Sequence, residues 1–129
     1  IRRGDYLHHK LFGGLCDLNY YKKAIDYVLN NYDTPQFYLF SNDIEWCKTY
    51  ILPLVQGYPF ILVDWNSGVE SYIYMQLMSC CRINIIANSS FSWWAAWLND
   101  SSEKIVIAPK LWAHSPYGKE IQLKSWLLF

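Results

Sequence analysis

The chain has 129 residues, a length that suits one domain over residues 1–129 with a sizeable buried core. Apolar residues make up 53% and charged residues 17%, which excludes a disordered chain. Eleven basic and eleven acidic side chains cancel, so no overall field attracts nucleic acid or an anionic membrane, and we expect no nucleic-acid partner. Apolar runs stay below the ~18 residues of a membrane-spanning helix, so the sequence predicts no transmembrane segment.

The cysteines and histidines have no metal-binding spacing. The three histidines form no H-x-x-x-H pattern, and the four cysteines include no C-x-x-C pair. The sequence therefore predicts no metal site. Free thiols in a reducing compartment are the favoured interpretation over disulfides, so we expect a cytoplasmic location, either free or on the cytoplasmic side of a membrane.

Short apolar segments alternate with helical patterns along the chain. The segments with the length of strands are the carboxyl end of one at 1–6, then 36–40, 60–63, 83–87 and 104–108. The expected helices are 18–31 after the N-cap Asp17, a short one from Asp43 to about Leu52, 69–81, and one that begins at 88–90. A loop is expected at 64–68. The stretch from Lys110 onward, which includes Trp112, Pro116, Tyr117 and Trp126, has no clear period and is not assigned.

This alternation predicts an α/β fold: a Rossmann-like parallel sheet flanked by helices. Ligands of such sheets bind beyond the carboxyl ends of the strands. Three polar turns are expected there, at 2–5, 41–43 and 88–90. They supply guanidinium groups, a carboxylate, and hydroxyl and N–H donors, which is the equipment for binding a nucleotide. The G-x-G-x-x-G and Walker A patterns are absent, so neither a dehydrogenase nor a P-loop NTPase is supported.

The stretch 84–97 is the centre of this arrangement. A buried apolar strand leads into Asn88, Ser89 and Ser90, whose side-chain oxygens suit a helix N-cap, and an aromatic-rich helix follows. A helix that begins at the carboxyl end of a strand presents unpaired N–H groups and a positive dipole end. We therefore expect an anionic ligand at this turn.

Several motifs, in this order and spacing, resemble those of the α-1,2-fucosyltransferases of glycosyltransferase family 11. They are IRRGDY at 1–6, FYLFSNDIEW at 37–46, MQLMS at 75–79, IIANSSFSWWAAW at 85–97 and IAPK-x-W at 107–112. The resemblance implies an inverting GDP-fucose:β-galactoside α-1,2-fucosyltransferase with a two-domain GT-B-like architecture, no required metal and no cofactor. It also implies that this chain is the carboxyl-terminal, donor-binding half, with the β-galactoside acceptor bound through an upstream half.

The chain departs from the family pattern in two places. The family motif H-x-R-R-G-D-Y would place a His before Ile1, so the chain is expected to be a fragment. Tyr74 stands where related sequences usually carry an Asp. Both departures favour an alternative interpretation, a noncatalytic nucleotide-binding or interaction remnant. A different GT-B transferase that uses another nucleotide sugar is a further alternative.

Arg2 and Arg3 are the candidates for stabilising the diphosphate leaving group, since a guanidinium fork binds phosphate bidentately. Successive side chains of an extended segment point in opposite directions, so one arginine could bind phosphate while the other pairs with Asp5 or another acid. The alternative is that both form ordinary surface ion pairs. Arg2, Arg3 and Asp5 make up the predicted catalytic group, in which Asp5 is expected to orient an arginine rather than act as the base.

The other predicted donor-binding residues follow the strands. Asp43 is expected to bind guanine or ribose donors, and Asn88, Ser89 and Ser90 are expected to bind phosphate. For all four residues the alternative is helix capping alone.

Trp93 completes the predicted donor-binding set, with core packing as the alternative. The general base is not assigned: Asp64 and Glu70 are candidates, and so is a residue of the upstream half.

Overall fold

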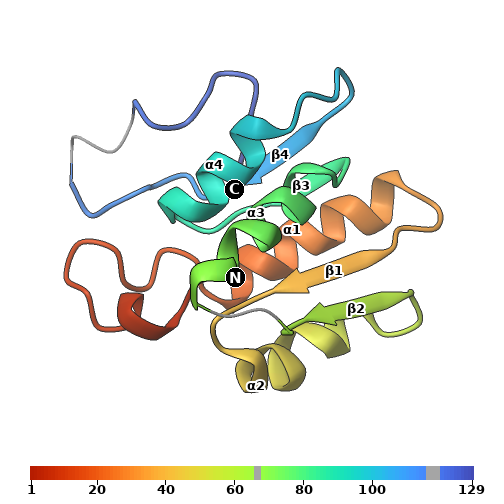
Figure 1. Ribbon diagram of the computed structural model, residues 1–129, viewed down its shortest axis with the longest axis horizontal. Helices are drawn as coiled ribbons and strands as arrows, with labels where there is room; N and C mark the ends of the chain where they lie inside the picture. The colour runs from red at the N-terminus through yellow and green to blue at the C-terminus, as the bar shows by residue number, and fades with distance from the viewer. Residues whose placement is uncertain (66–67, 116–119) are drawn as a thin grey trace.

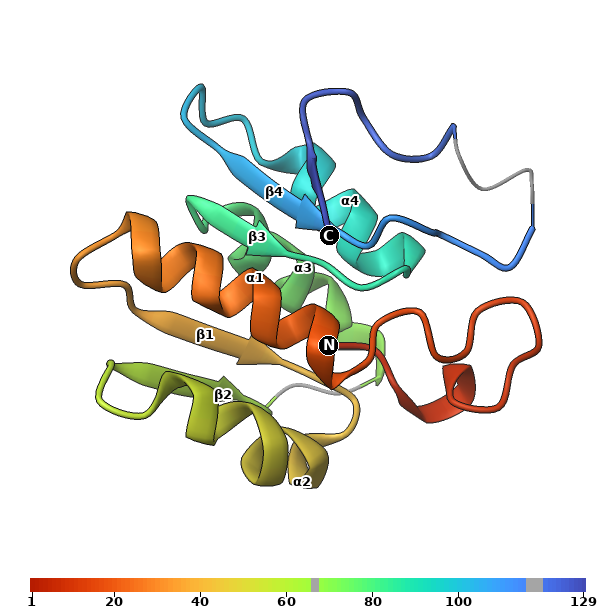
Figure 2. The same cartoon turned by 180° about the vertical axis from the view of Figure 1, so that it is seen from behind.

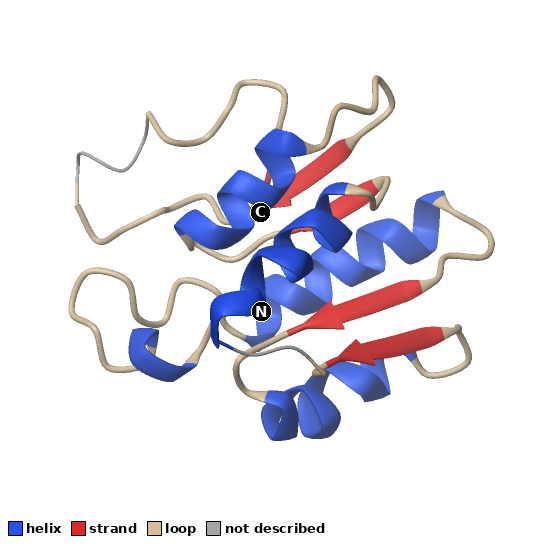
Figure 3. Ribbon diagram, viewed as in Figure 1, coloured by secondary structure: helices blue, strands red, loops and turns tan. Residues whose placement is uncertain are grey.

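The strands of the chain lie parallel in two sheets, and helices cover both faces (Figures 1 and 3). The computed structural model describes residues 1–65, 68–115 and 120–129, so Asn66 and Ser67 of the expected loop, and Pro116 and Tyr117, lie outside the described residues. The strands are β1 (Phe37–Phe40), β2 (Phe60–Val63), β3 (Ile83–Ile85), β4 (Ile105–Ala108) and β5 (Leu127–Leu128). The α-helices are α1 (Leu18–Asn31), α2 (Ile44–Trp46), α3 (Ser71–Ser79) and α4 (Ser90–Leu98). Further single turns span Gly4–Tyr6, Cys47–Ile51, Leu52–Val55 and Gly68–Glu70.

One sheet pairs β1 with β2, and the other has the order β3-β4-β5. Every pairing is parallel, with Phe37 opposite Phe60, Ile83 opposite Ile105, and Ile107 opposite Leu127. In Figures 1 and 2 the arrows of both sheets point in the same direction, with β1 and β3 on the facing sides. The predicted α/β fold with parallel strands is confirmed, but the strands form two separate ladders rather than one.

Helix α1 covers one face of both sheets. Asp17 accepts a hydrogen bond from the Tyr20 N–H at 2.8 Å, which confirms the predicted N-cap. Ile25 packs in the cluster that contains Leu39 of β1, and Val28 packs in the cluster that contains Ile107 of β4. The period of its apolar residues predicts one buried face, and the structure shows that this face packs on both sheets.

Helix α3 lies on the opposite face, in front of the sheets in Figure 1 and behind them in Figure 2. The ring of its Tyr74 meets Phe40 of β1 edge to face, with 5.8 Å between ring centroids. The buried Asn84 side chain of β3 donates to the Met78 carbonyl oxygen of α3 at 2.7 Å. Both sheets therefore contact α3 as well as α1.

Three expectations need correction. Residues 1–6 do not end a strand here: residues 1–3 are irregular and Gly4–Tyr6 forms a 3₁₀ turn. Ser89 is the N-cap of α4, but its side chain makes no capping hydrogen bond. The expected helix after Asp43 changes character, because α2 passes into a π-type turn and then a 3₁₀ turn around Pro53.

Candidate functional site

A crevice of about 600 Å³ opens at the carboxyl ends of β1 and β3. The three polar turns predicted to converge all contribute to it, and the starts of α3 and α4 form the remaining walls. Its lining consists of Ile1, Arg2, Asp5, Tyr6, Phe40, Ser41, Asn42, Gly68, Ser71, Tyr74, Met78, Ala87, Ser89, Ser90, Phe91 and Ser92. A smaller hollow of about 100 Å³ is lined by both arginines, Cys16 and Asn88, among others. The structure therefore brings Arg2 and Arg3 to the turn that begins α4.

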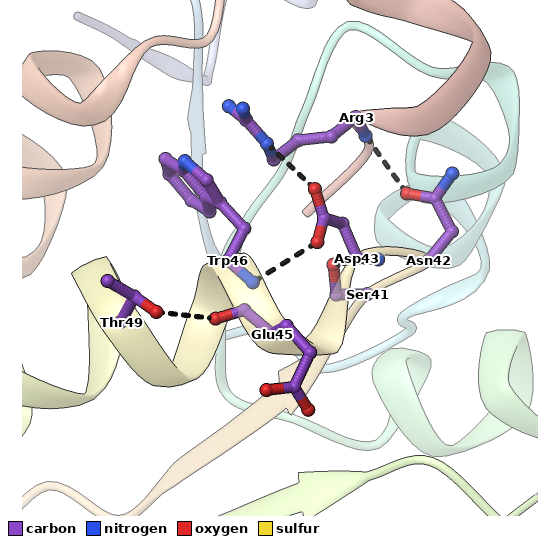
Figure 4. Close-up of polar contacts among 7 residues, drawn as sticks. All are labelled: Arg3, Ser41, Asn42, Asp43, Glu45, Trp46 and Thr49. Atoms are coloured by element: carbon purple, nitrogen blue, oxygen red, sulfur yellow. Dashed lines mark hydrogen bonds and ion pairs between the residues drawn. The ribbon is translucent and has the colours of Figure 1, made fainter.

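Arg3 is held in a closed network beside β1 (Figure 4). Its Nε donates to Asp43 Oδ2 at 3.3 Å, its backbone N–H donates to Asn42 Oδ1 at 2.9 Å, and its guanidinium lies 3.9 Å from the ring centroid of Trp46. The other carboxylate oxygen of Asp43 accepts the Trp46 N–H at 3.1 Å, which caps α2. Both oxygens of Asp43 thus have partners within the protein, and Asp43 is not among the described residues that line the crevice.

Arg2 has more open surroundings. One terminal nitrogen pairs with Asp5 at 2.8 Å, and both side chains of this pair are substantially exposed, at 39% and 62%. The Nε of Arg2 is buried and has no hydrogen-bond partner in the described part of the chain. Both arginines thus pair with a carboxylate, Arg2 with Asp5 and Arg3 with Asp43, as the ion-pair alternative describes. Phosphate binding by either arginine stays a prediction, and Arg2 is the one of the two that lines the larger crevice.

Asn88 joins segments that lie far apart in the sequence. Its side-chain nitrogen donates to the carbonyl oxygens of Phe12 at 3.0 Å and Trp112 at 3.2 Å, and its oxygen accepts the Cys16 thiol at 3.4 Å. With 3% exposure and these partners, the side chain holds the 7–16 loop against the start of α4. This arrangement favours a structural role for the Asn88 side chain.

The first turn of α4 supplies donors to the crevice. The N–H of Trp93 bonds to the Ser89 carbonyl at 2.9 Å, so the helical ladder begins there and leaves the N–H groups of the preceding turn without helical partners. Ser89 and Ser90 line the crevice at this turn, and Ser90 is exposed. The positive end of the α4 dipole and these donors suit an anionic group.

Trp93 and the two candidate bases lie elsewhere. The Trp93 indole N–H donates to the Ile121 carbonyl oxygen at 2.8 Å, and its ring stacks on Trp97 with centroids 5.3 Å apart. Trp93 is not among the described residues lining the crevice, and neither are the exposed carboxylates Asp64 and Glu70. The contacts of Trp93 agree with the packing alternative.

Burial raises the pKa of the Cys16 thiol to about 11, although the hydrogen bond to Asn88 acts in the opposite direction. The thiol is therefore protonated at neutral pH and is a poor nucleophile. All four cysteines are free, as predicted. Among the described residues no cluster of three or more His, Cys, Asp or Glu side chains is placed to hold a metal ion.

The comparison with known families decides what kind of protein carries this crevice. The model of glycosyl transferase family 11 matches residues 1–129. The chain belongs to glycosyltransferase family 11.

Relatives of this family 11 chain include two proteins from Escherichia coli. The O-antigen biosynthesis glycosyltransferase WbnK is 39% identical over 98% of this chain and 42% of its own length. An alpha-1,2-colitosyltransferase is 42% identical over 87% of this chain and 39% of its own length. The galactoside alpha-(1,2)-fucosyltransferase 2 of Mus musculus is 30% identical over 92% of this chain and 34% of its own length. The chain thus spans about two fifths or less of these relatives, and no solved structure matches it.

As a family 11 domain, the chain has crevice residues that sequence reasoning missed. Phe40, Ser71, Tyr74, Met78 and Phe91 line the crevice but were not predicted as site residues. The available signal was position: Phe40 directly precedes a polar turn, and Ser71, Tyr74 and Phe91 lie on the first turns of α3 and α4. Met78 lies in the last turn of α3, where the sequence carried no such signal. None of the helices in the described part of the chain has both the length and the hydropathy of a membrane span.

Proposed function

We propose that this family 11 chain forms the donor-binding part of an inverting α-1,2-fucosyltransferase that transfers L-fucose from GDP-fucose to the 2-OH of a β-galactoside. The proposal includes a GT-B architecture, an acceptor site supplied by an upstream half, and chemistry without a metal or cofactor. One observation carries it: Arg2 and the amide-bearing first turn of α4 line the same crevice in a chain of this family.

The chemistry of the transfer explains why these groups are suitable. As the glycosidic bond to the donor breaks, positive charge develops on the sugar and negative charge on the departing diphosphate. Preorganised donors that face the developing negative charge are often worth a few kcal/mol of barrier lowering. Arg2 provides a partly exposed guanidinium at the crevice, and α4 provides N–H groups and a helix dipole. Arg3 and Asp43 would then act by fixing the turns around the leaving group.

The other walls of the crevice suit the remaining parts of a nucleotide sugar. The crevice lining also includes the apolar rings and side chains of Phe40, Tyr74, Met78 and Phe91. A volume of about 600 Å³ lies within the range of typical small-molecule sites, roughly 300–1,000 Å³. We propose that the sugar and base use these apolar walls while the diphosphate faces Arg2 and α4.

Calorimetric titration with GDP and UDP tests the donor site. We expect GDP to bind and UDP to bind at least about tenfold more weakly, a difference of roughly 1.4 kcal/mol. Equal binding of both nucleotides would argue for another nucleotide sugar, and no binding of either would contradict the donor site. For catalysis, a longer protein that includes an acceptor half should transfer fucose to lactose. Failure of the folded protein to do so contradicts the fucosyltransferase assignment.

Two alternatives to an active fucosyltransferase are each supported by one observation: a different donor sugar and a noncatalytic remnant. The 42% identity to an alpha-1,2-colitosyltransferase favours colitose as a second candidate sugar, so colitosyl and fucosyl donors should be compared in the same transfer assay. Tyr74, where related sequences usually carry Asp, favours a noncatalytic nucleotide-binding remnant. GDP binding without transfer of either sugar would support the remnant.

A further inference from the structure

Two buried hydroxyl groups engage the segment that leads from β3 into α4. The first is that of Tyr20 on α1, whose Oη lies 2.6 Å from the carbonyl oxygen of Ile86 and 3.1 Å from that of Ile107. A hydroxyl carries one proton, so the shorter contact, to Ile86, is its main hydrogen bond. Burial raises the pKa of the Tyr20 hydroxyl well above its ordinary value, so the group remains a donor at neutral pH. The Ile86 carbonyl is therefore engaged inside the protein.

The second hydroxyl belongs to Ser92, on the first turn of α4. Its proton is shared between the carbonyl oxygens of Ala87 at 3.0 Å and Ser89 at 3.1 Å, and the Ser92 side chain is buried. The Ala87 carbonyl also accepts the Ser89 N–H at 2.8 Å, and the Ser89 carbonyl accepts the Trp93 N–H at 2.9 Å. Three carbonyl groups of the 86–89 segment thus have donors within the protein.

The N–H groups that follow this segment are not used in the same way. Helix α4 begins at Ser90, and its N-cap residue Ser89 makes no side-chain capping hydrogen bond. In the described part of the chain, the N–H groups of Ser90, Phe91 and Ser92 have no protein acceptor. All three residues line the crevice. The turn therefore offers free donors to the crevice while three of its carbonyl groups are occupied.

This division of donors and acceptors favours an anionic ligand. N–H groups and the positive end of the α4 dipole attract an anion, whereas a carbonyl oxygen that faced it would repel it. Loss of either hydroxyl leaves a buried carbonyl short of a donor, which favours rotation of that peptide group. The hydroxyls also reach the segment from two sides, because α1 and α4 lie on opposite faces of the sheets in Figures 1 and 2.

We propose that Tyr20 and Ser92 are positioning residues of the donor site, whose hydroxyls hold the carbonyl groups of the 86–89 segment so that the free N–H groups of α4 face the diphosphate. This inference rests on the proposed function, because it takes the diphosphate of a nucleotide sugar as the anion at the turn. Tyr20 acts through Ile86 from the first turn of α1, and its side chain is not among the described residues that line the crevice.

Calorimetric titration of the chain with GDP and with pyrophosphate tests the inference. Tyr20→Phe keeps the ring and removes only the hydroxyl, and Ser92→Ala removes the hydroxyl on the other side of the segment. We expect each substitution to weaken the binding of both ligands about fivefold. The amide protons of Ser90 and Phe91, observed by NMR at saturating GDP, report the contact itself. Their downfield shift on binding should be smaller in both variants than in the unsubstituted chain.

Two controls match the substitutions. Tyr27→Phe removes a hydroxyl from the same helix, where the Tyr27 ring packs edge to face on Phe129. Ser79→Ala removes a serine hydroxyl that donates to the Gln76 carbonyl at 2.8 Å, on a helix turn whose serine is not among the described crevice residues. Both controls should bind GDP and pyrophosphate as the unsubstituted chain does.

Equal binding by the two variants and the unsubstituted chain would overturn this inference and leave the donor site in place. Weaker binding with unchanged amide shifts at saturation would overturn it as well, because the peptide groups would then keep their orientation. If Tyr20→Phe does not fold, Ser92→Ala decides by itself. Equal affinity for GDP and UDP would contradict the donor assignment but not this result, since pyrophosphate carries no base. If the unsubstituted chain binds neither GDP nor pyrophosphate, both proposals are wrong.

Discussion

Arg2 and Arg3 are adjacent in the sequence, yet their surroundings differ in kind. The Arg3–Asp43 pair is 18% and 31% exposed, lies against Trp46 and is tied to the cap of α2. The Arg2–Asp5 pair is 39% and 62% exposed and belongs to one short turn. Exposed ion pairs contribute little to stability, whereas a partly buried and hydrogen-bonded charge leaves an expensive gap when its partner is removed. The difference supports the proposal that Arg3 fixes the local structure while Arg2 contacts the ligand.

The substitution Arg3→Ala should have the largest effect. It leaves Asp43 without its guanidinium partner and removes the contact with Trp46, so we expect the free energy of unfolding in urea to fall by about 2–3 kcal/mol. Arg82→Ala is the matched control, because the Arg82–Glu103 pair is 61% and 70% exposed and should change stability by about 0.5 kcal/mol or less. Similar losses of stability in both variants would contradict the distinction between the partly buried Arg3–Asp43 pair and exposed ion pairs.

Gly4→Ala should rank second. Gly4 has φ +26°, and a Cβ there would collide with the Asn42 amide that accepts the Arg3 N–H. We expect a loss of about 2 kcal/mol, from backbone strain and from displacement of Asn42. Gly57→Ala is the control, because Gly57 has φ +95° but nothing within 4 Å of its Cβ position, so strain alone applies. If Gly4→Ala weakens GDP binding and Gly57→Ala does not, the contacts among Arg3, Asn42 and Asp43 help to shape the crevice.

Arg2→Ala should reverse the pattern of Arg3→Ala. We expect GDP to bind at least about tenfold more weakly, roughly 1.4 kcal/mol, while stability changes by about 0.5 kcal/mol or less. Asp5→Asn is the control: it removes the exposed pair but keeps the guanidinium, so GDP should bind as well as before or slightly better. If neither Arg2→Ala nor Arg3→Ala weakens GDP binding tenfold, the arginines do not hold the diphosphate.

Local patterns in the sequence predicted the elements well. Helix α1 and its Asp17 cap, strand β2 and the Asp43 cap were all recognisable, because each depends on residues within one turn or one strand. The convergence of the three polar turns also followed, because carboxyl ends of parallel strands share one edge. Strand β5 was missed, since two residues, Leu127–Leu128, leave no period to detect.

Side-chain partners across long distances could not be predicted. Asn88 was expected to face phosphate, but its amide is used by Phe12, 76 residues earlier, and by Trp112. Asp43 was expected to face a nucleotide, but Arg3, 40 positions earlier in the chain, takes one of its oxygens. Trp93 had the alternative of packing, which its hydrogen bond to the Ile121 carbonyl and its stacking on Trp97 favour. Such pairings depend on how loops fold back, which no local period records.

The smallest expected effect is on the pH dependence of stability and concerns Cys16, whose thiol donates a hydrogen bond to Asn88. Burial raises the pKa of its thiol in the folded chain to about 11, from an ordinary value of 9.0. A raised folded-state pKa gives stability that is fully present below pH 9 and is lost as the pH rises toward 11, because the unfolded chain releases the proton first. Between pH 8 and pH 10 the chain should lose about 1 kcal/mol more than Cys16→Ala in urea unfolding. Burial, the largest cause that raises the pKa values of the Tyr20 and Tyr21 hydroxyls, is common to both proteins. Cys16 adds a smaller upward contribution to both pKa values, which Cys16→Ala removes and which acts in the same direction as the loss from the thiol itself. If the free energy of unfolding of the two proteins changed equally with pH, the Cys16 thiol would be exposed to solvent in the folded chain, contrary to its buried position.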